Sequence, residues 1–290
     1  MQIIVNIILS FSLWITLTLS ITIIYQSSKF FHIAHAIIIT SGAYFTYLYY
    51  NQLRIKFWIA IILAVVCSVL LSIFIELLIY KPLRKKNVSP WKMLISSLGI
   101  YIIFQNIISL IWGDETKTIR DWKIISGNRI LGAYITKIQV ISIILYITVF
   151  SLTYIYMKYS TIGKKIKAVS SNEELSEYFG INTNSIVLIS FVIGSFLASI
   201  CGILIALDTD ISVTMGFRYL ILSVVIMIIS GIFNIKGLIY GALLLSVCIH
   251  ISGYLIGTQW MDAITYLILI LFLIWKPLGF SGRSIRKREV

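Results

Sequence analysis

The stretch that decides the fold is residues 57–80, FWIAIILAVVCSVLLSIFIELLIY, in which Glu76 is the one charged residue. A transmembrane helix needs about 20 consecutive, mostly apolar residues. The apolar residues here run continuously and do not alternate with polar ones, so the pattern indicates a helix and not a strand of a membrane barrel. Residues 57–80 therefore predict a membrane-spanning helix.

Further stretches of the same character follow one another along the chain, at 3–25, 31–50, 91–112, 138–157, 186–207, 219–234, 237–256 and 260–275. The 219–234 stretch is short and fits a re-entrant segment as well as a span. Composition agrees, because 59% of the residues are hydrophobic and 12% are charged, against about 25% charged in soluble domains. We predict an all-α fold, a polytopic transmembrane helix bundle with eight or nine spans.

The net charge of +13 comes from short basic runs between apolar stretches. This distribution favours contact with anionic lipid headgroups and gives no reason to expect nucleic acid. With nine spans, the basic clusters at 81–92, 158–167 and 276–288 fall on one side, which the positive-inside rule makes cytoplasmic. The N-terminus is then outside and the C-terminus inside. The loop at about 113–137, external in this topology, mixes basic with acidic residues and weakens the assignment without reversing it.

No catalytic motif is present: neither a Walker A sequence nor HExxH nor GxSxG occurs. His32 and His35 have a spacing that a metal site could use, but the third histidine, His250, lies in a distant span. The three cysteines fall within apolar segments and form no CxxC. We expect no catalytic residues, no metal and no cofactor in this chain.

Polar residues mark two places inside the spans. The second span opens after a polar break with His32 and His35, followed by Ser41 and Gly42, and the fourth span carries Gln105 and Asn106 at its middle. Polar groups in a membrane usually face the bundle interior or a water-filled path. We predict that a solute pathway is bordered by His35, Ser41, Gly42, Gln105 and Asn106. Ordinary helix packing and hydrogen bonds between helices are the alternative. Glu76 and Asp262 lie near span ends, where each could simply reach the interface.

The loop at about 158–185 is the most polar stretch on the side assigned to the cytoplasm. Within it we predict a short helix over 172–179, begun by a capping box of Ser170 or Ser171 with the following glutamates and ended by Gly180. The helix would carry Leu175, Tyr178 and Phe179 near one face. A solvated loop has no need of three large apolar side chains, so this helix is expected to dock in a partner's groove. A helix lying on the membrane surface is the alternative.

Four blocks in register resemble one known family, the LivH-type permeases of branched-chain amino acid ABC importers. The blocks are Lys29–Tyr44, Tyr80-Lys81-Pro82-Leu83-Arg84 with Leu98–Gly113, Thr161–Asn182, and Ile232–Ala242 with Trp275–Phe280. The resemblance covers essentially the whole chain. It departs at His32, where the family has asparagine, and at Ala36, where it has glycine, so the substrate is open among branched-chain amino acids, other amino acids and small amides.

The resemblance implies one permease domain over residues 1–290 of the bacterial inner membrane. It implies as partners a second permease subunit, two cytoplasmic ATPase subunits that bind the ATP, and an external solute-binding protein. It also implies that Glu173, Leu175, Tyr178, Phe179 and Gly180 form the contact that couples the chain to the ATPases. The other reading is a secondary transporter or channel without an ATPase, which would be expected to show functional intramembrane carboxylates and inverted repeats.

Overall fold

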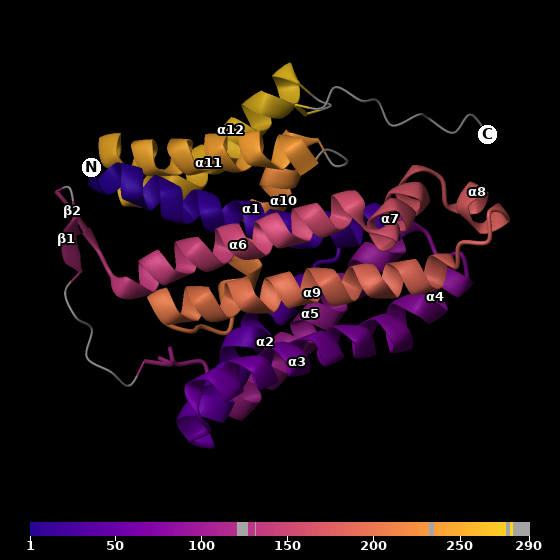
Figure 1. The fold of residues 1–290 in the computed structure, drawn as a ribbon, viewed down its shortest axis with the longest axis horizontal. Coiled ribbons are helices and arrows are strands. Elements are labelled where there is room, and N and C mark those ends of the chain that lie inside the picture. Colours follow the sequence, from indigo (N-terminus) through magenta and orange to yellow (C-terminus); the bar gives the residue numbers. More distant parts are fainter. Residues whose placement is uncertain (121–126, 131, 232–234, 277–278, 281–290) are drawn as a thin grey trace.

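The computed structural model describes residues 1–120, 127–130, 132–231, 235–276 and 279–280, and these residues form a helical bundle (Figure 1). Its α-helices are α1 Gln2–Ser28, α2 His35–Tyr47, α3 Phe57–Ile75, α4 Lys81–Lys85, α5 Pro90–Trp112, α6 Lys137–Tyr159, α7 Thr161–Ser171, α8 Glu173–Tyr178, α9 Thr183–Asp208, α10 Met215–Ser230, α11 Ile235–Leu255 and α12 Met261–Trp275. Two π-helical turns, η1 Leu48–Gln52 and η2 Glu76–Tyr80, extend α2 and α3, and a short 3₁₀ turn, η3 Thr258–Trp260, precedes α12. Strands β1 Asn128–Ile130 and β2 Ala133–Ile135 pair as an antiparallel hairpin.

The centre of the bundle is made by α1, α2 and α9. About two thirds of the apolar window is buried in α1 and in α9, whereas α5 and α6 each bury 22% and expose apolar side chains such as Leu110 and Leu152. A helix that is apolar on its outer face needs lipid or a partner to cover it. The all-α transmembrane bundle predicted from the sequence is confirmed.

Within the described residues, six helices are long and apolar enough to cross a membrane: Gln2–Ser28, Phe57–Lys85, Pro90–Trp112, Lys137–Tyr159, Thr183–Asp208 and Lys236–Leu255. Two shorter apolar helices, Met215–Ser230 and Ala263–Phe272, accompany them. The α2 helix is buried in the bundle, and η1 continues it toward Gln52. The number of spans, eight or nine, stays a prediction.

Small residues bring the central helices together backbone to backbone. A Cβ atom on Gly202 of α9 would lie 1.9 Å from the carbonyl oxygen of Ile39 in α2, and one on Gly42 would lie 2.6 Å from the carbonyl oxygen of Ser199. A Cβ atom on Gly194 would meet the Ser20 carbonyl of α1 at 2.8 Å. This is the close approach that small residues spaced four apart permit in lipid.

The two ends of the bundle differ. The N-terminus and the β1–β2 hairpin lie at one end, on the left in Figure 1, and α4, α7 and α8 lie at the other. At the left end, the Gln2 side chain donates to the carbonyl of Tyr134 and thereby ties α1 to β2. The basic residues of α4 and α7 gather at the right end with α8. We call this the basic end.

Candidate functional site

A non-helical segment, residues 29–34, separates α1 from α2 near the basic end. His35 begins α2 fully buried, and its Nε2 lies 3.0 Å from the hydroxyl of Ser20 in α1. His32 is also buried, and its ring is surrounded by the rings of Phe30, Tyr80 and Phe191. The histidine pair therefore joins helices inside the bundle.

Hydrogen bonds extend from this segment to two further helices. The Tyr80 hydroxyl, from η2, lies 3.1 Å from His32 Nδ1 and donates to Ser97 Oγ of α5 at 2.9 Å. Ser97 Oγ also accepts from the backbone amide of Ala34 at 2.9 Å. Besides α1 and α2, which flank it in sequence, two further elements therefore hold segment 29–34 in place. They are η2, which extends α3, and α5.

The predicted pathway residues fall into two separate places. His35, Ser41 and Gly42 are buried in α2, where the Ser41 hydroxyl donates to Ser68 Oγ at 3.2 Å. On α5, Gln105 is half-buried and Asn106 is exposed, with its amide donating to the carbonyl of its own helix at Ile102. The structure thus brings the α2 residues together and leaves the α5 amides on an outer face of the bundle. Their contact with a solute stays a prediction.

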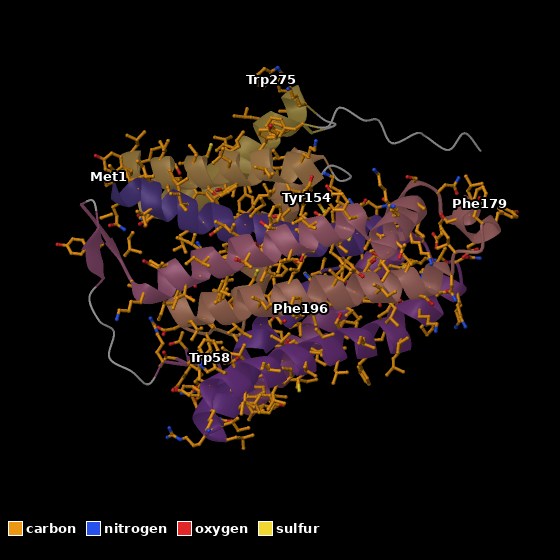
Figure 2. The ribbon with its side chains drawn as sticks, viewed as in Figure 1. Met1, Trp58, Tyr154, Phe179, Phe196 and Trp275 are labelled. Atoms are coloured by element: carbon orange, nitrogen blue, oxygen red, sulfur yellow. The ribbon has the colours of Figure 1, made fainter. Side chains whose placement is uncertain are left out.

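Two cavities lie elsewhere. An apolar groove of about 610 Å³ runs between α3 and α9, and a smaller cavity of about 170 Å³ lies among α1, α6, α9 and α10. Phe196 of α9, which Figure 2 labels near the middle of the bundle, is one of the residues that line the first, and Asp208 lines the second. None of the predicted pathway residues lines either cavity.

The α7 helix is built into the bundle. Ile166 and Val169 are fully buried against α1, α6 and α9, and a Cβ atom on Gly163 would lie 2.1 Å from the carbonyl oxygen of Met157. The sequence predicts a polar loop for this stretch, and the structure shows a packed helix instead. The spacing of Ile162, Ile166 and Val169 is the signal for an amphipathic helix that this prediction missed.

The predicted helix at 172–179 is confirmed as α8, Glu173–Tyr178. The predicted serine cap is wrong: Asn172 Oδ1 accepts from the backbone amide of Leu175 at 3.0 Å. Neither serine caps α8, because both belong to the last turn of α7, where Ser171 Oγ donates to the Lys167 carbonyl. Gly180 ends the helix as expected, with a φ of +75° that glycine adopts without strain.

Large apolar side chains of α8 project away from the bundle. Leu175 is 51% exposed, Tyr178 88% and Phe179 79%, and Figure 2 shows Phe179 at the far tip. On the bundle side, Glu177 accepts a hydrogen bond of 2.5 Å from the hydroxyl of Thr183, which starts α9. The geometry fits a helix whose apolar face is free to meet another surface. Glu173 and Gly180 lie at its two ends.

Lys29 joins segment 29–34 to the α7–α8 turn. Its ammonium group donates to the carbonyl of Ser170 in the last turn of α7. Burial lowers the pKa of Lys29 to about 8, and the nearby carboxylate of Glu173 opposes this shift.

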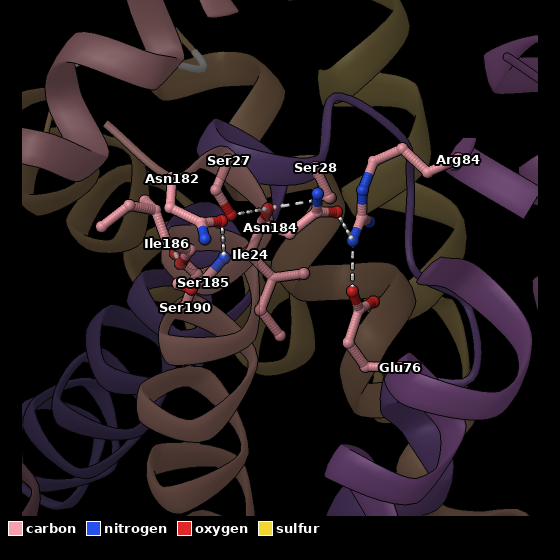
Figure 3. Close-up of polar contacts among 10 residues, drawn as sticks. All are labelled: Ile24, Ser27, Ser28, Glu76, Arg84, Asn182, Asn184, Ser185, Ile186 and Ser190. Atoms are coloured by element: carbon pink, nitrogen blue, oxygen red, sulfur yellow. Dashed lines mark hydrogen bonds and ion pairs between the residues drawn. The ribbon is translucent and has the colours of Figure 1, made fainter. Parts of the chain in front are cut away.

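A buried ion pair lies close by (Figure 3). The Arg84 guanidinium of α4 donates to Glu76 of η2 at 2.5 Å and reaches Asn184 of α9 at 3.5 Å. The Glu76 side chain is 1% exposed, so the reading that it reaches the interface is wrong. It is buried because Arg84 lies two helical turns further along the same continuous helix and compensates its charge. The side chain of Asp262 lies outside the described residues.

Among the described residues, no three His, Cys, Asp or Glu side chains come together in a way that could hold a metal ion. Several polar side chains near the basic end form hydrogen bonds between helices, among them His35, Tyr80 and Arg84. Other buried atoms there, His32 Nε2 and Glu76 Oε2 among them, have no hydrogen-bond partner within the described ranges.

Comparison with known proteins gives one consistent result. Residues 3–273 match the model of the family described as branched-chain amino acid transport system / permease component. The high-affinity branched-chain amino acid transport system permease protein LivH of Salmonella typhimurium is 26% identical over 287 residues, covering 94% of this chain and 92% of the relative. BraD of Pseudomonas aeruginosa, described in the same words, is 27% identical over 289 residues with the same coverage.

LivH of Escherichia coli is 30% identical over 217 residues, 72% of this chain and 69% of the relative. Among solved structures, a chain of PsaBC from Streptococcus pneumoniae in complex with Fab matches with a TM-score of 0.50 and 13% identity. That match covers 96% of this chain and 92% of the other. At this identity it shows a shared fold.

Proposed function

Because the chain belongs to the permease-component family of branched-chain amino acid transport systems, we propose that it is a permease subunit of an ABC importer. Its solute is a branched-chain amino acid, a related amino acid or a small amide. The solute arrives from an external solute-binding protein and crosses the bacterial inner membrane. The energy comes from ATP bound by two partner ATPase subunits, since this chain has no Walker A sequence.

The observation that carries the proposal is the exposed apolar face of α8. Burying Leu175, Tyr178 or Phe179 fully would contribute about 1.5–3 kcal/mol for each side chain. A groove in a cytoplasmic ATPase subunit provides such burial for a short helix. The α8 helix, hinged at Asn172 beyond the buried α7, is the element of the basic end best placed to enter it.

The alternative site for this face, the membrane surface, fits the charges poorly. The polar side of α8 carries Glu173, Glu174 and Glu177, and residues 172–182 contain no lysine or arginine. Helices that lie on membranes are rich in basic residues because the cytoplasmic leaflet is anionic. Acidic residues favour a basic protein surface instead.

We propose that the basic end is cytoplasmic. The basic residues of α4 and α7 gather there with α8, as the positive-inside rule expects. The N-terminus and the β1–β2 hairpin then face outside, where the binding protein docks, and the C-terminus is inside.

The solute route is proposed to lie between this chain and a second permease subunit. Inside the chain the central helices touch backbone to backbone at Gly42 and Gly202, which leaves no room for a solute between α2 and α9. On the outer face of α5, the exposed amide of Asn106 and the half-buried Gln105 could meet a solute in a shared interface. His35 and Ser41 lie behind that interface in α2, where they bond to Ser20 of α1 and to Ser68 of α3.

A secondary transporter or channel remains the alternative. It would need a functional carboxylate inside the bundle, and the buried Glu76 is instead held by Arg84.

The test replaces two apolar residues of α8 together, Leu175→Ala with Phe179→Ala, in the assembly reconstituted with its ATPase subunits and binding protein. We expect loss of the ATPase subunits on purification, or ATP hydrolysis that no longer responds to loaded binding protein. The matched control is Leu152→Ala with Ile155→Ala, two apolar residues of α6 that are 62% and 51% exposed. If the α8 variant keeps its subunits and its stimulated turnover, α8 is not the coupling contact.

A further inference from the structure

The turn between α7 and α8 is one of two connections between the exposed helix and the buried bundle. The other is the start of α9, where Glu177 accepts a hydrogen bond from the Thr183 hydroxyl. In the first connection Asn172 is extended, with φ −157° and ψ 113°. It separates a helix packed into the bundle from a helix of six residues that projects from it. A movement of α8 therefore reaches α7 across Asn172, and it reaches α9 across residues 179–182.

Lys29 contacts one side of the α7–α8 turn and interacts electrostatically with the other. Its ammonium group donates to the Ser170 carbonyl, which belongs to the last turn of α7, where carbonyls lack helical partners and favour a cation. It also lies within electrostatic reach of Glu173, the first residue of α8. A swing of α8 about Asn172 would change the separation of Glu173 from Lys29 while the Ser170 contact keeps the ammonium group in place.

The backbone of Lys29 is fixed where it can pass on such a change. Lys29 ends α1 in the left-handed conformation with φ 60°, which a lysine adopts at some cost, and its amide donates to the carbonyl of Tyr25. The next residues form segment 29–34. Through His32 that segment is bound to Tyr80 and Ser97, so a displacement of Lys29 acts on α1, α2, η2 and α5 together.

We propose that Lys29 is the positioning residue that transmits movement of α8 to segment 29–34. The proposal rests on the coupling role given to α8 above. Coupling requires that an interaction differ between the two states of the transporter. A swing of α8 changes the distance between the charges of Lys29 and Glu173, and so it changes their attraction. If Lys29 had only a structural role, its interactions with α7 and α8 would be the same in both states.

The test uses Lys29→Met, which keeps the length of the side chain and removes its charge and its hydrogen-bond donors. The control is Lys165→Met, which removes the same charge from an exposed position of α7. Lys29→Arg is the rescue variant. Each is reconstituted with the ATPase subunits and the binding protein, and three quantities are measured: retained ATPase subunits, stimulation of ATP hydrolysis by loaded binding protein, and solute transported per ATP.

We expect Lys29→Met to retain its ATPase subunits and to lose about fivefold or more of its stimulation and of its transport per ATP, the lower range of measured coupling between sites. Lys29→Arg should restore most of both, and Lys165→Met should match the unmodified chain. Stimulation of Lys29→Met equal to that of Lys165→Met would overturn the proposal. Loss of the ATPase subunits from Lys29→Met alone would also overturn it, because Lys29 would then merely shape the docking surface.

If Lys29→Met is not recovered as a folded assembly, Glu173→Gln decides. It leaves the Lys29–Ser170 hydrogen bond and removes the charge on the other side of the turn. We expect reduced stimulation with retained subunits, and unchanged stimulation would refute transmission through Lys29. Failure of the proposed function has a different signature, because the unmodified chain would then bind no ATPase subunit at all.

Discussion

Replacing Gly202 by alanine should force α2 and α9 apart. The added Cβ atom would lie 1.9 Å from the carbonyl oxygen of Ile39 and 2.8 Å from its carbonyl carbon. Both atoms belong to the backbone of α2, so no side chain can rotate away. Overpacking of this kind costs about 1–3 kcal/mol and occasionally more, whereas alanine regains about 1 kcal/mol of helix propensity over glycine. The contact is short enough to place the packing cost at the upper end.

We therefore expect the free energy of unfolding to fall by roughly 2 kcal/mol. On the scale of soluble domains this corresponds to a fall in Tm of roughly 4–8 °C. The assay is thermal unfolding of the purified chain in detergent. The matched control is Gly99→Ala in α5, where an added Cβ atom meets nothing within 4 Å, and which should leave the Tm unchanged or raise it. A Gly202→Ala variant as stable as Gly99→Ala would refute the close packing of α2 on α9.

Four further variants test three contacts of the basic end. Arg84→Met should lower the free energy of unfolding by about 3–5 kcal/mol because it leaves the buried Glu76 charge without a partner. Adding Glu76→Leu should recover most of the lost Tm. A Tm unaffected by Arg84→Met would contradict the pairing. Tyr80→Phe removes the hydroxyl between His32 and α5 and should lower the free energy of unfolding by about 1–3 kcal/mol. An unchanged Tm would mean that the hydrogen bonds of this hydroxyl contribute little to stability. Asn172→Ala removes the cap of α8 and should weaken that helix by about 0.5–2 kcal/mol. Amide hydrogen exchange should then become faster in α8 and stay unchanged in α7. Equal exchange rates in α8 of the variant and of the unmodified chain would argue against the cap.

The sequence was a good guide wherever a local pattern decides the structure. The apolar stretches 3–25 and 186–207 correspond to α1, Gln2–Ser28, and α9, Thr183–Asp208, because long apolar runs in lipid have few alternatives to helix. The short helix at 172–179 and its glycine stop were also predictable, since Gly180 supplies a conformation that other residues avoid.

What the sequence left open depends on contacts between distant segments. The residues next to Glu76 in the sequence do not indicate that it is buried. Its partner Arg84 comes within reach only because η2 and α4 continue as one helix. The same holds for His35, whose partner Ser20 lies on a different helix. Asn172 caps α8 in place of Ser170 because α7 continues to Ser171. Val169, which is buried against the bundle, keeps this last turn of α7 helical.

The polar stripe of α1 has a consequence for the making of the protein. Ser12, Thr16 and Ser20 are fully buried in the finished bundle, and the helices that bury α1 most are α9 and α11. At roughly 5–20 residues per second, the ribosome needs on the order of 10–30 s after α1 to complete the chain as far as the start of α9. During that interval α1 has left the ribosome without its final neighbours, and its hydroxyls bond back to its own carbonyls, as Thr16 does to Ser12. The first helix to be made is thus one of the last to be enclosed, and its nascent form depends on the insertion machinery or on lipid until the second half of the chain arrives.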